Sequence, residues 1–174
     1  MTPDIALDAL RWQFDMTWEL AQYHLAPLTD YECLWQPAHA SWTVRLVDGL
    51  WEHDWDEAGP ATPAPPSIAW ITWQIGWWWT EALARVHGEP GPGPQGVRWP
   101  GSADGVRAQL TQLADRWRAV LAGLDTAALA RPSTFPWPEP RPFAMTLAWA
   151  HAELMKNIAE VGVLRHLYQA TRAP

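Results

Sequence analysis

Residues 143–168 carry the strongest structural signal in the chain, a stripe with the spacing of an amphipathic helix. Its members recur at alternating steps of four and three residues, which brings them onto one helix face. The stripe consists of Phe143, Leu147, Ala150, Leu154, Asn157, Val161, Leu164 and Tyr168. Because Asn157 is an amide in an otherwise apolar stripe, we expect it to be buried and hydrogen-bonded. Glu153 and Glu160, four residues before and three after it, are its neighbours on the helix surface.

Three further segments show a similar periodicity between connections rich in Pro and Gly. We predict helices over residues 3–26, 67–87, 102–123 and 143–169. Pro27 ends the first helix, while Ser67 caps the start of the second and Gly88 follows its end. No strand-length alternation of apolar and polar residues is evident. The predicted fold is therefore all-α, a four-helix bundle with long crossover loops, with residues 1–174 as one domain.

The connection over residues 28–66 is unusually long and carries four tryptophans with little periodicity. Connections of this length are usually functional or packed as a lid, so we expect part of it to cover one end of the bundle. Its run Trp51-Glu-His-Asp-Trp-Asp-Glu57 offers His53, Asp54 and Asp56 as ion ligands. Acidic runs of this kind commonly face water, and we predict a solvated acidic loop here.

Charge and composition exclude several classes of partner. The net charge is -7 and the 12 Lys and Arg residues are scattered, which argues against nucleic acid. The longest apolar run, residues 68–79, is interrupted by polar residues and shorter than the roughly 20 residues that span a bilayer. No signal-peptide pattern is present, so we expect a cytoplasmic protein without a membrane segment. Cys33 is the single cysteine, which precludes an internal disulfide, and we interpret it as a packed side chain.

Tryptophan is the compositional outlier, with 15 copies. Each indole carries a large apolar area and an N–H group that needs a partner when buried. We predict that most of the tryptophans fill the core and that a few line a ligand cavity. No catalytic residue is assigned, because the chain has no nucleophile motif, no Cys-His pair at a motif spacing and no Gly-rich phosphate loop.

Sites in helical bundles are built from polar side chains that project inward from facing helices. Gln74 lies on the apolar face of the second predicted helix, and we expect it to converge with Glu153 and Asn157 in a polar pocket ringed by tryptophan. The candidate ligand-binding residues are Gln74, Trp78, Glu153, Asn157 and Glu160. His151 is predicted to point away from the row of Glu153 and Asn157 and to lie exposed or at a boundary.

Several sequence segments together carry a resemblance to a known family. They are Leu34-Trp-Gln-Pro37 with Ser41-Trp-Thr-Val-Arg45, Ser67-Ile-Ala-Trp-Ile-Thr-Trp-Gln-Ile-Gly76, and Ala152-Glu-Leu-Met-Lys-Asn-Ile-Ala-Glu-Val161 with Leu164-Arg-His-Leu-Tyr168. The chain resembles the DinB-like superfamily of metal-binding four-helix bundles, which includes S-transferases that use bacillithiol or mycothiol. In that family three histidines bind a divalent metal, commonly zinc or nickel. The resemblance places Gln74, Glu153 and Asn157 at the positions of those histidines.

The replaced residues favour a function without metal. Neutral amides are poor zinc ligands, and one carboxylate gives little charge to hold calcium or magnesium. The first hypothesis is therefore a binding protein with no bound metal or other cofactor, whose pocket holds a small polar ligand. The second is a thiol S-transferase in which Glu153 and water hold zinc or nickel in an unconventional way. The third is a structural homodimer formed through apolar helix faces.

Overall fold

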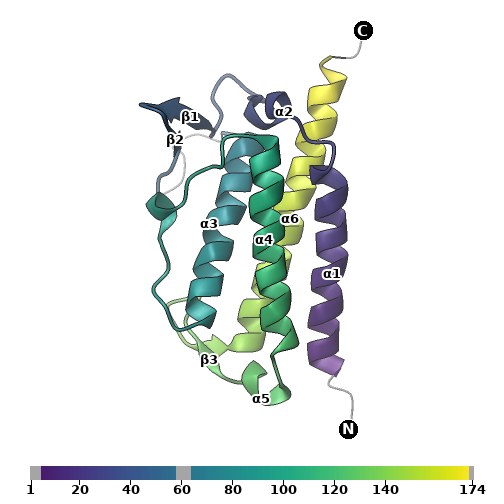
Figure 1. The fold of residues 1–174 in the computed structure, drawn as a ribbon, viewed down its shortest axis with the longest axis vertical. Coiled ribbons are helices and arrows are strands. Elements are labelled where there is room, and N and C mark those ends of the chain that lie inside the picture. The colour runs from purple at the N-terminus through teal and green to yellow at the C-terminus, as the bar shows by residue number, and fades with distance from the viewer. Residues whose placement is uncertain (1–4, 58–63, 173–174) are drawn as a thin grey trace.

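The computed structural model describes residues 5–57 and 64–172, which form a bundle of four long helices (Figure 1). These helices are α1 (Ile5–Leu25), α3 (Ile68–Val86), α4 (Ala103–Ala122) and α6 (Phe143–Ala170). α1 and α3 each contact both α4 and α6, so α1 and α3 occupy diagonal positions. The predicted all-α fold is confirmed, and Ser67 caps α3 by accepting a hydrogen bond from the backbone N–H of Trp70.

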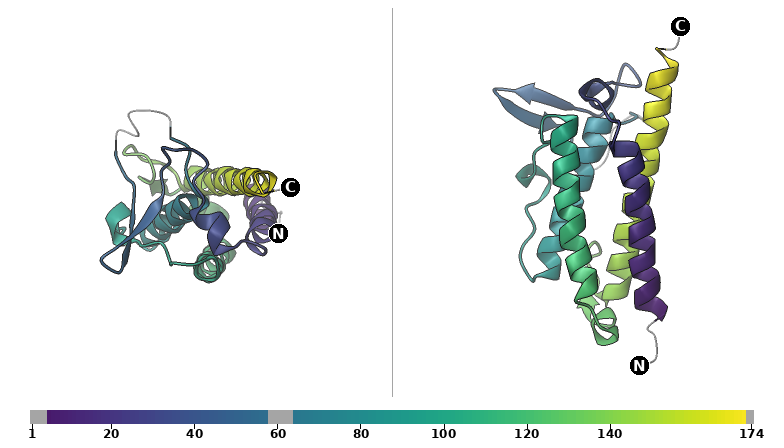
Figure 2. Two further views of the ribbon diagram at one scale, coloured as in Figure 1. Left: turned by 90° about the horizontal axis from the view of Figure 1, so that it is seen from above. Right: turned by 45° about the vertical axis from the view of Figure 1, so that its right-hand side comes forward.

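The directions of the helices explain the long connections. α1 and α6 run one way along the bundle, whereas α3 and α4 run the other way (Figure 1). Because α3 and α4 are parallel, residues 88–101 must return along the outside of the bundle, and they include a short 3-10 helix, η1 (Pro94–Gly96). The right-hand view of Figure 2 shows the same return, which confirms the predicted crossover.

Much of the 28–66 connection covers one end of the bundle, as predicted (Figure 1). It contains a short helix, α2 (Asp30–Leu34), and an antiparallel hairpin of β1 (Val44–Val47) and β2 (Leu50–His53). The sequence shows no strand-length alternation, and this short hairpin was not predicted. The turn between the strands is Asp48-Gly49, and both residues have positive φ values, of 51° and 81°. Asp-Gly is a strong signal for a two-residue hairpin turn, so the sequence did contain the information.

The run from Trp51 to Glu57 is not a solvated acidic loop, because its first half is strand β2 and its middle is half-buried. Asp54 accepts a hydrogen bond from the backbone N–H of Thr43 at 2.9 Å and forms an ion pair with Arg45. The His53 ring stacks on Trp73 with 3.6 Å between ring centroids. Burial lowers the pKa of His53. The Asp54 contacts join the two sides of the hairpin, and the stacking of His53 on Trp73 attaches the hairpin to α3, which corrects the prediction.

The opposite end of the bundle is closed by shorter elements. α5 (Thr126–Leu129) follows α4, and the two-residue strands β3 (Pro132–Ser133) and β4 (Arg141–Pro142) pair immediately before α6. Figure 1 places α5 and β3 together at this end, away from α2 and the hairpin. This end is therefore covered by short segments, in contrast to the long helices that form the body of the bundle.

Tryptophan fills the centre of the bundle. Five indoles are almost completely buried: Trp18, Trp73, Trp79, Trp99 and Trp117. Several donate to internal acceptors, as in Trp73 Nε1 to the carbonyl of Val97 at 2.8 Å and Trp99 Nε1 to Thr72 Oγ1 at 3.1 Å. The packing interpretation is confirmed for these five. None of the helices in the described ranges has the length and apolar character needed to cross a bilayer.

Candidate functional site

Gln74 and Asn157 meet where α3 packs against α6, as the two stripes predicted. Asn157 is fully buried, with an exposed fraction of 0%, whereas Gln74 is half-buried. Asn157 Nδ2 donates a hydrogen bond to Gln74 Oε1 at 3.3 Å. Trp78, one helical turn after Gln74, donates from Nε1 to Asn157 Oδ1 at 3.2 Å. Three of the candidate residues therefore form one hydrogen-bonded chain.

The indole of Trp78 fixes the orientation of both amides. An indole N–H can only donate, so the atom of Asn157 that faces it must be the carbonyl oxygen. The amino group of Asn157 is then directed to Gln74, whose facing atom must be its carbonyl oxygen. Each amide oxygen of the cluster thus accepts one hydrogen bond from a neighbouring side chain.

The two glutamates are placed differently from the amides. Glu153 is half-buried and its carboxylate pairs with Lys156 Nζ at 2.6 Å. Glu160 is exposed and lines a groove of about 460 Å³ along α6 together with Lys156 and Pro66. Neither carboxylate has a hydrogen bond to Gln74 or Asn157 among the described residues. The structure therefore brings together Gln74, Trp78 and Asn157, with Glu153 and Glu160 on either side of them along α6.

His151 was predicted to be exposed or at a boundary, and this was wrong. Its exposed fraction is 1%. Trp117 Nε1 donates to His151 Nε2 at 3.0 Å, and His151 Nδ1 lies 3.3 Å from Gln13 Oε1. Because an indole only donates, Nε2 is the acceptor and the proton of the neutral ring is on Nδ1. Burial lowers the pKa of His151 to about 4.

An ion pair between Glu32 and Arg165 was not foreseen from the sequence. Arg165 Nε donates to Glu32 Oε1 at 3.1 Å and Arg165 Nη1 donates to the carbonyl oxygen of His24. The other carboxylate oxygen of Glu32 accepts from the backbone N–H and hydroxyl of Thr29, which completes a capping box at the start of α2. Glu32 and Arg165 are only 4% and 8% exposed. The pair therefore attaches α2 to α6.

Cys33 is fully buried, as predicted for a packed side chain. Burial raises the pKa of its thiol to about 12, with smaller contributions from Asp30 and Glu32. A thiol in this state carries almost no thiolate near neutral pH, and thiolate is the nucleophilic form. Cys33 therefore does not qualify as a nucleophile.

The arrangement of helices and the sequence both match known proteins. A family model for the DinB superfamily matches residues 13–161. The chain belongs to the DinB superfamily. No curated protein matches it. Its fold is similar to that of a conserved protein from Enterococcus faecalis, with a TM-score of 0.63 and 12% sequence identity over 92% of this chain and 95% of that chain. At this identity the likeness concerns the fold alone.

Within this DinB-superfamily chain, the residues at the expected metal position do not fit a zinc or nickel ion. Zinc is bound by imidazole, thiolate or carboxylate, and the amide oxygens of Gln74 and Asn157 already accept hydrogen bonds. Glu153 would supply one carboxylate, which is paired with Lys156. No group of three His, Cys, Asp or Glu side chains in the described ranges is arranged to hold a metal.

Hydrogen-bond donors, in contrast, remain available near Gln74. Within the described ranges Gln74 Nε2 donates to no protein atom, and Trp77 Nε1 is buried without a partner. Gln74 and Trp77 are three residues apart on α3 and are therefore neighbours on its surface. Of the two donors Trp77 Nε1 is the buried one, and buried N–H groups are normally paired in native proteins. An acceptor outside these side chains would satisfy them.

Coupling between Asn157 and Gln74 can be measured with a double-mutant cycle. Asn157→Leu should lower the free energy of unfolding by about 1–3 kcal/mol, because the Trp78 N–H and the Gln74 oxygen lose their partners. Gln74→Leu should also destabilise, and the double variant should lose less than the sum of the two single losses. The measurement is urea unfolding, with the exposed Gln22→Leu as control. Additive losses would show that the two amides are not coupled.

Proposed function

We propose that this DinB-superfamily protein binds a small polar molecule between α3 and α6 without a metal ion. The observation that carries the proposal is that the amide oxygens of Gln74 and Asn157 are each engaged in a hydrogen bond from a neighbouring side chain, whereas Gln74 Nε2 and Trp77 Nε1 have no protein partner in the described ranges. The groups without a protein partner at this position are N–H donors, which recognise acceptor atoms of a ligand. Chemistry that requires a Lewis acid would need ligands that this cluster does not offer.

The surroundings of Gln74 suggest the kind of molecule. Gln74 Nε2 and Trp77 Nε1 would each donate to an oxygen, so a carbonyl or carboxylate group is the matching feature. Trp78 lies edge-to-face with Trp149, at 5.6 Å between ring centroids. Such aromatic side chains provide apolar contact area beside polar atoms. The proposed ligand is therefore small, bears acceptor oxygens and has an apolar part.

Metal binding separates this proposal from the S-transferase alternative. The unmodified protein should show little change in melting temperature with added zinc or nickel. The variant Gln74→His/Glu153→His/Asn157→His should gain stability, because positions 153 and 157 are one helical turn apart and Gln74 already faces Asn157. A metal that binds only the folded state stabilises it by about 2.7 kcal/mol at a concentration one hundred times its Kd.

The control for this experiment is elemental analysis of the parent purified without chelators. One transition metal per chain, or a large metal-dependent rise in melting temperature that Glu153→Ala abolishes, would contradict the proposal and favour the enzyme.

Native mass spectrometry of the same sample examines the ligand itself. A co-purifying small molecule should be lost in Gln74→Leu and retained in Gln22→Leu. Equal retention in both variants would place the ligand elsewhere.

A further inference from the structure

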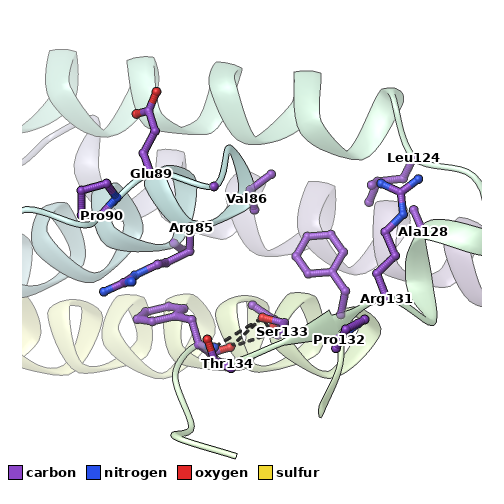
Figure 3. A pocket seen from close by; sticks show the side chains of 15 residues that line it. Arg85, Val86, Glu89, Pro90, Leu124, Ala128, Arg131, Pro132, Ser133 and Thr134 are labelled. Atoms are coloured by element: carbon purple, nitrogen blue, oxygen red, sulfur yellow. Dashed lines mark hydrogen bonds between the residues drawn. The ribbon is translucent and has the colours of Figure 1, made fainter. Parts of the chain in front are cut away.

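A cavity of about 470 Å³ lies at the end of the bundle opposite to α2 and the hairpin (Figure 3). The last turns of α3, the region of α5, strand β3 and the first turn of α6 surround it. Along α3, Val86 in its wall is twelve residues from Gln74, which corresponds to about 18 Å. The cavity is therefore separate from the amide cluster, and its size is typical of sites for small molecules.

Apolar atoms form a little more than half of the cavity wall. Ala82 and Val86 contribute from α3, Leu124 follows α4, and Phe135 and Phe143 contribute aromatic rings from the segment before α6 and from its first residue. Phe135 and Phe143 are half-buried. The apolar part of an occupant would therefore contact these side chains.

Hydrogen bonds hold one wall of the cavity in place. Thr146 Oγ1 on α6 donates to the carbonyl oxygen of Phe135 at 2.6 Å. The hydroxyl oxygens of Thr146 and Ser133 lie 2.9 Å apart, and Figure 3 shows this cluster of bonds at the floor of the cavity. The segment over residues 133–135 is thus fixed to α6 before any ligand arrives. A preformed wall reduces the entropy lost on binding.

The charged side chains that line the cavity differ in whether another residue compensates their charge. Arg85 donates to Glu81 Oε1 from Nε at 3.0 Å and from Nη2 at 2.9 Å, so its charge is compensated. Arg131 has no ion pair among the described residues, although it lines the cavity. The carboxylate of Glu89 points away from Ser133 and Thr134, at the other side of the cavity from Arg131 (Figure 3). Arg131 is therefore the cation available to an occupant.

We infer that this cavity binds a small organic anion with an apolar body and a single carboxylate, and that Arg131 is the counter-ion. A guanidinium matches the geometry of a carboxylate with two parallel hydrogen bonds. One uncompensated arginine balances one negative charge, which favours a monocarboxylate over a phosphate dianion. The apolar wall accounts for the rest of the molecule, as in sites where few polar groups fix the orientation.

Benzoate is a suitable probe for the full-length protein, with the neutral benzamide as its isostere. In an NMR titration benzoate should shift the backbone amides of Gly88 and Thr134, which line the cavity, and benzamide should bind more weakly. Arg131→Gln should weaken benzoate binding about tenfold or more, because a hydrogen bond to a charged group is lost. Arg116→Gln, an equal change of charge at an exposed residue of α4 outside the cavity, should leave the affinity unchanged.

A second variant tests the cavity without changing its charge. Val86→Trp should fill the space and abolish benzoate binding, and circular dichroism would verify that the helices are retained. Gln74→Leu should leave benzoate binding intact, so failure here and failure of the proposed function are distinguishable. The inference would be overturned if benzamide bound as tightly as benzoate, or if Arg131→Gln and Arg116→Gln had equal effects. It would also be overturned if a folded Val86→Trp variant still bound benzoate, or if the amides of Gly88 and Thr134 did not shift.

Discussion

Arg165→Met should lower the free energy of unfolding by about 3–5 kcal/mol, measured by urea unfolding at neutral pH. The loss is expected because Glu32, only 4% exposed, would remain buried without its cation. The carbonyl oxygen of His24 would also lose the hydrogen bond from Arg165 Nη1. Removing one partner of a buried ion pair is more costly than removing both, since the remaining charge is desolvated and uncompensated.

Two further variants separate this ion pair from general effects of charge. Arg116→Met, at an exposed position of α4, should change stability by no more than about 0.5 kcal/mol. Adding Glu32→Gln to Arg165→Met should recover part of the loss, because a neutral amide tolerates burial better and can still accept from Thr29. If Arg165→Met is as stable as Arg116→Met, the ion pair does not anchor α2 as described.

His151 should make the protein less stable in mild acid by up to about 3 kcal/mol. Its pKa is lowered from 6.5 to about 4 by burial, and each pKa unit corresponds to about 1.4 kcal/mol. Above pH 6.5 the imidazole is neutral in the folded and unfolded chains, so it makes no pH-dependent contribution. Between pH 6.5 and about 4 only the unfolded chain binds the proton, and the free energy of unfolding falls as the pH falls.

His151→Gln is the matched variant, because its carbonyl can accept from Trp117 and its amino group can donate to Gln13. Unfolding of both proteins by urea, at a series of pH values between about 7 and about 4.5, should give curves that diverge below the ordinary histidine pKa of about 6.5. Burial also lowers the pKa of His24 and of His53, so the parent's own slope contains their contributions. The difference between the two proteins isolates His151. Parallel curves would show that His151 does not stay neutral in the fold.

The helices were predictable because their determinants are local. Apolar residues at steps of three and four residues define one helix face, and Pro27, Ser67 and Gly88 mark helix limits through backbone geometry and capping. The same periodicity placed Asn157 inside the bundle. Its pairing with Gln74 was expected from the resemblance to the superfamily together with the positions of the two stripes. The hairpin could also have been predicted from the sequence, because Asp48-Gly49 is a local turn signal.

The sequence by itself thus determined the four helices, their buried stripes and the family, whereas the tertiary structure decided which polar groups meet. His151 flanks the stripe of α6, and its burial depends on α1 and α4 closing over that flank with Gln13 and Trp117. Glu32 and Arg165 are 133 residues apart, and no local pattern relates them. The cavity beside Arg131 exists because short segments from four parts of the chain close one end of the bundle incompletely. Each of these features depends on the relative positions of helices, which are set by packing and not by the sequence of any single segment.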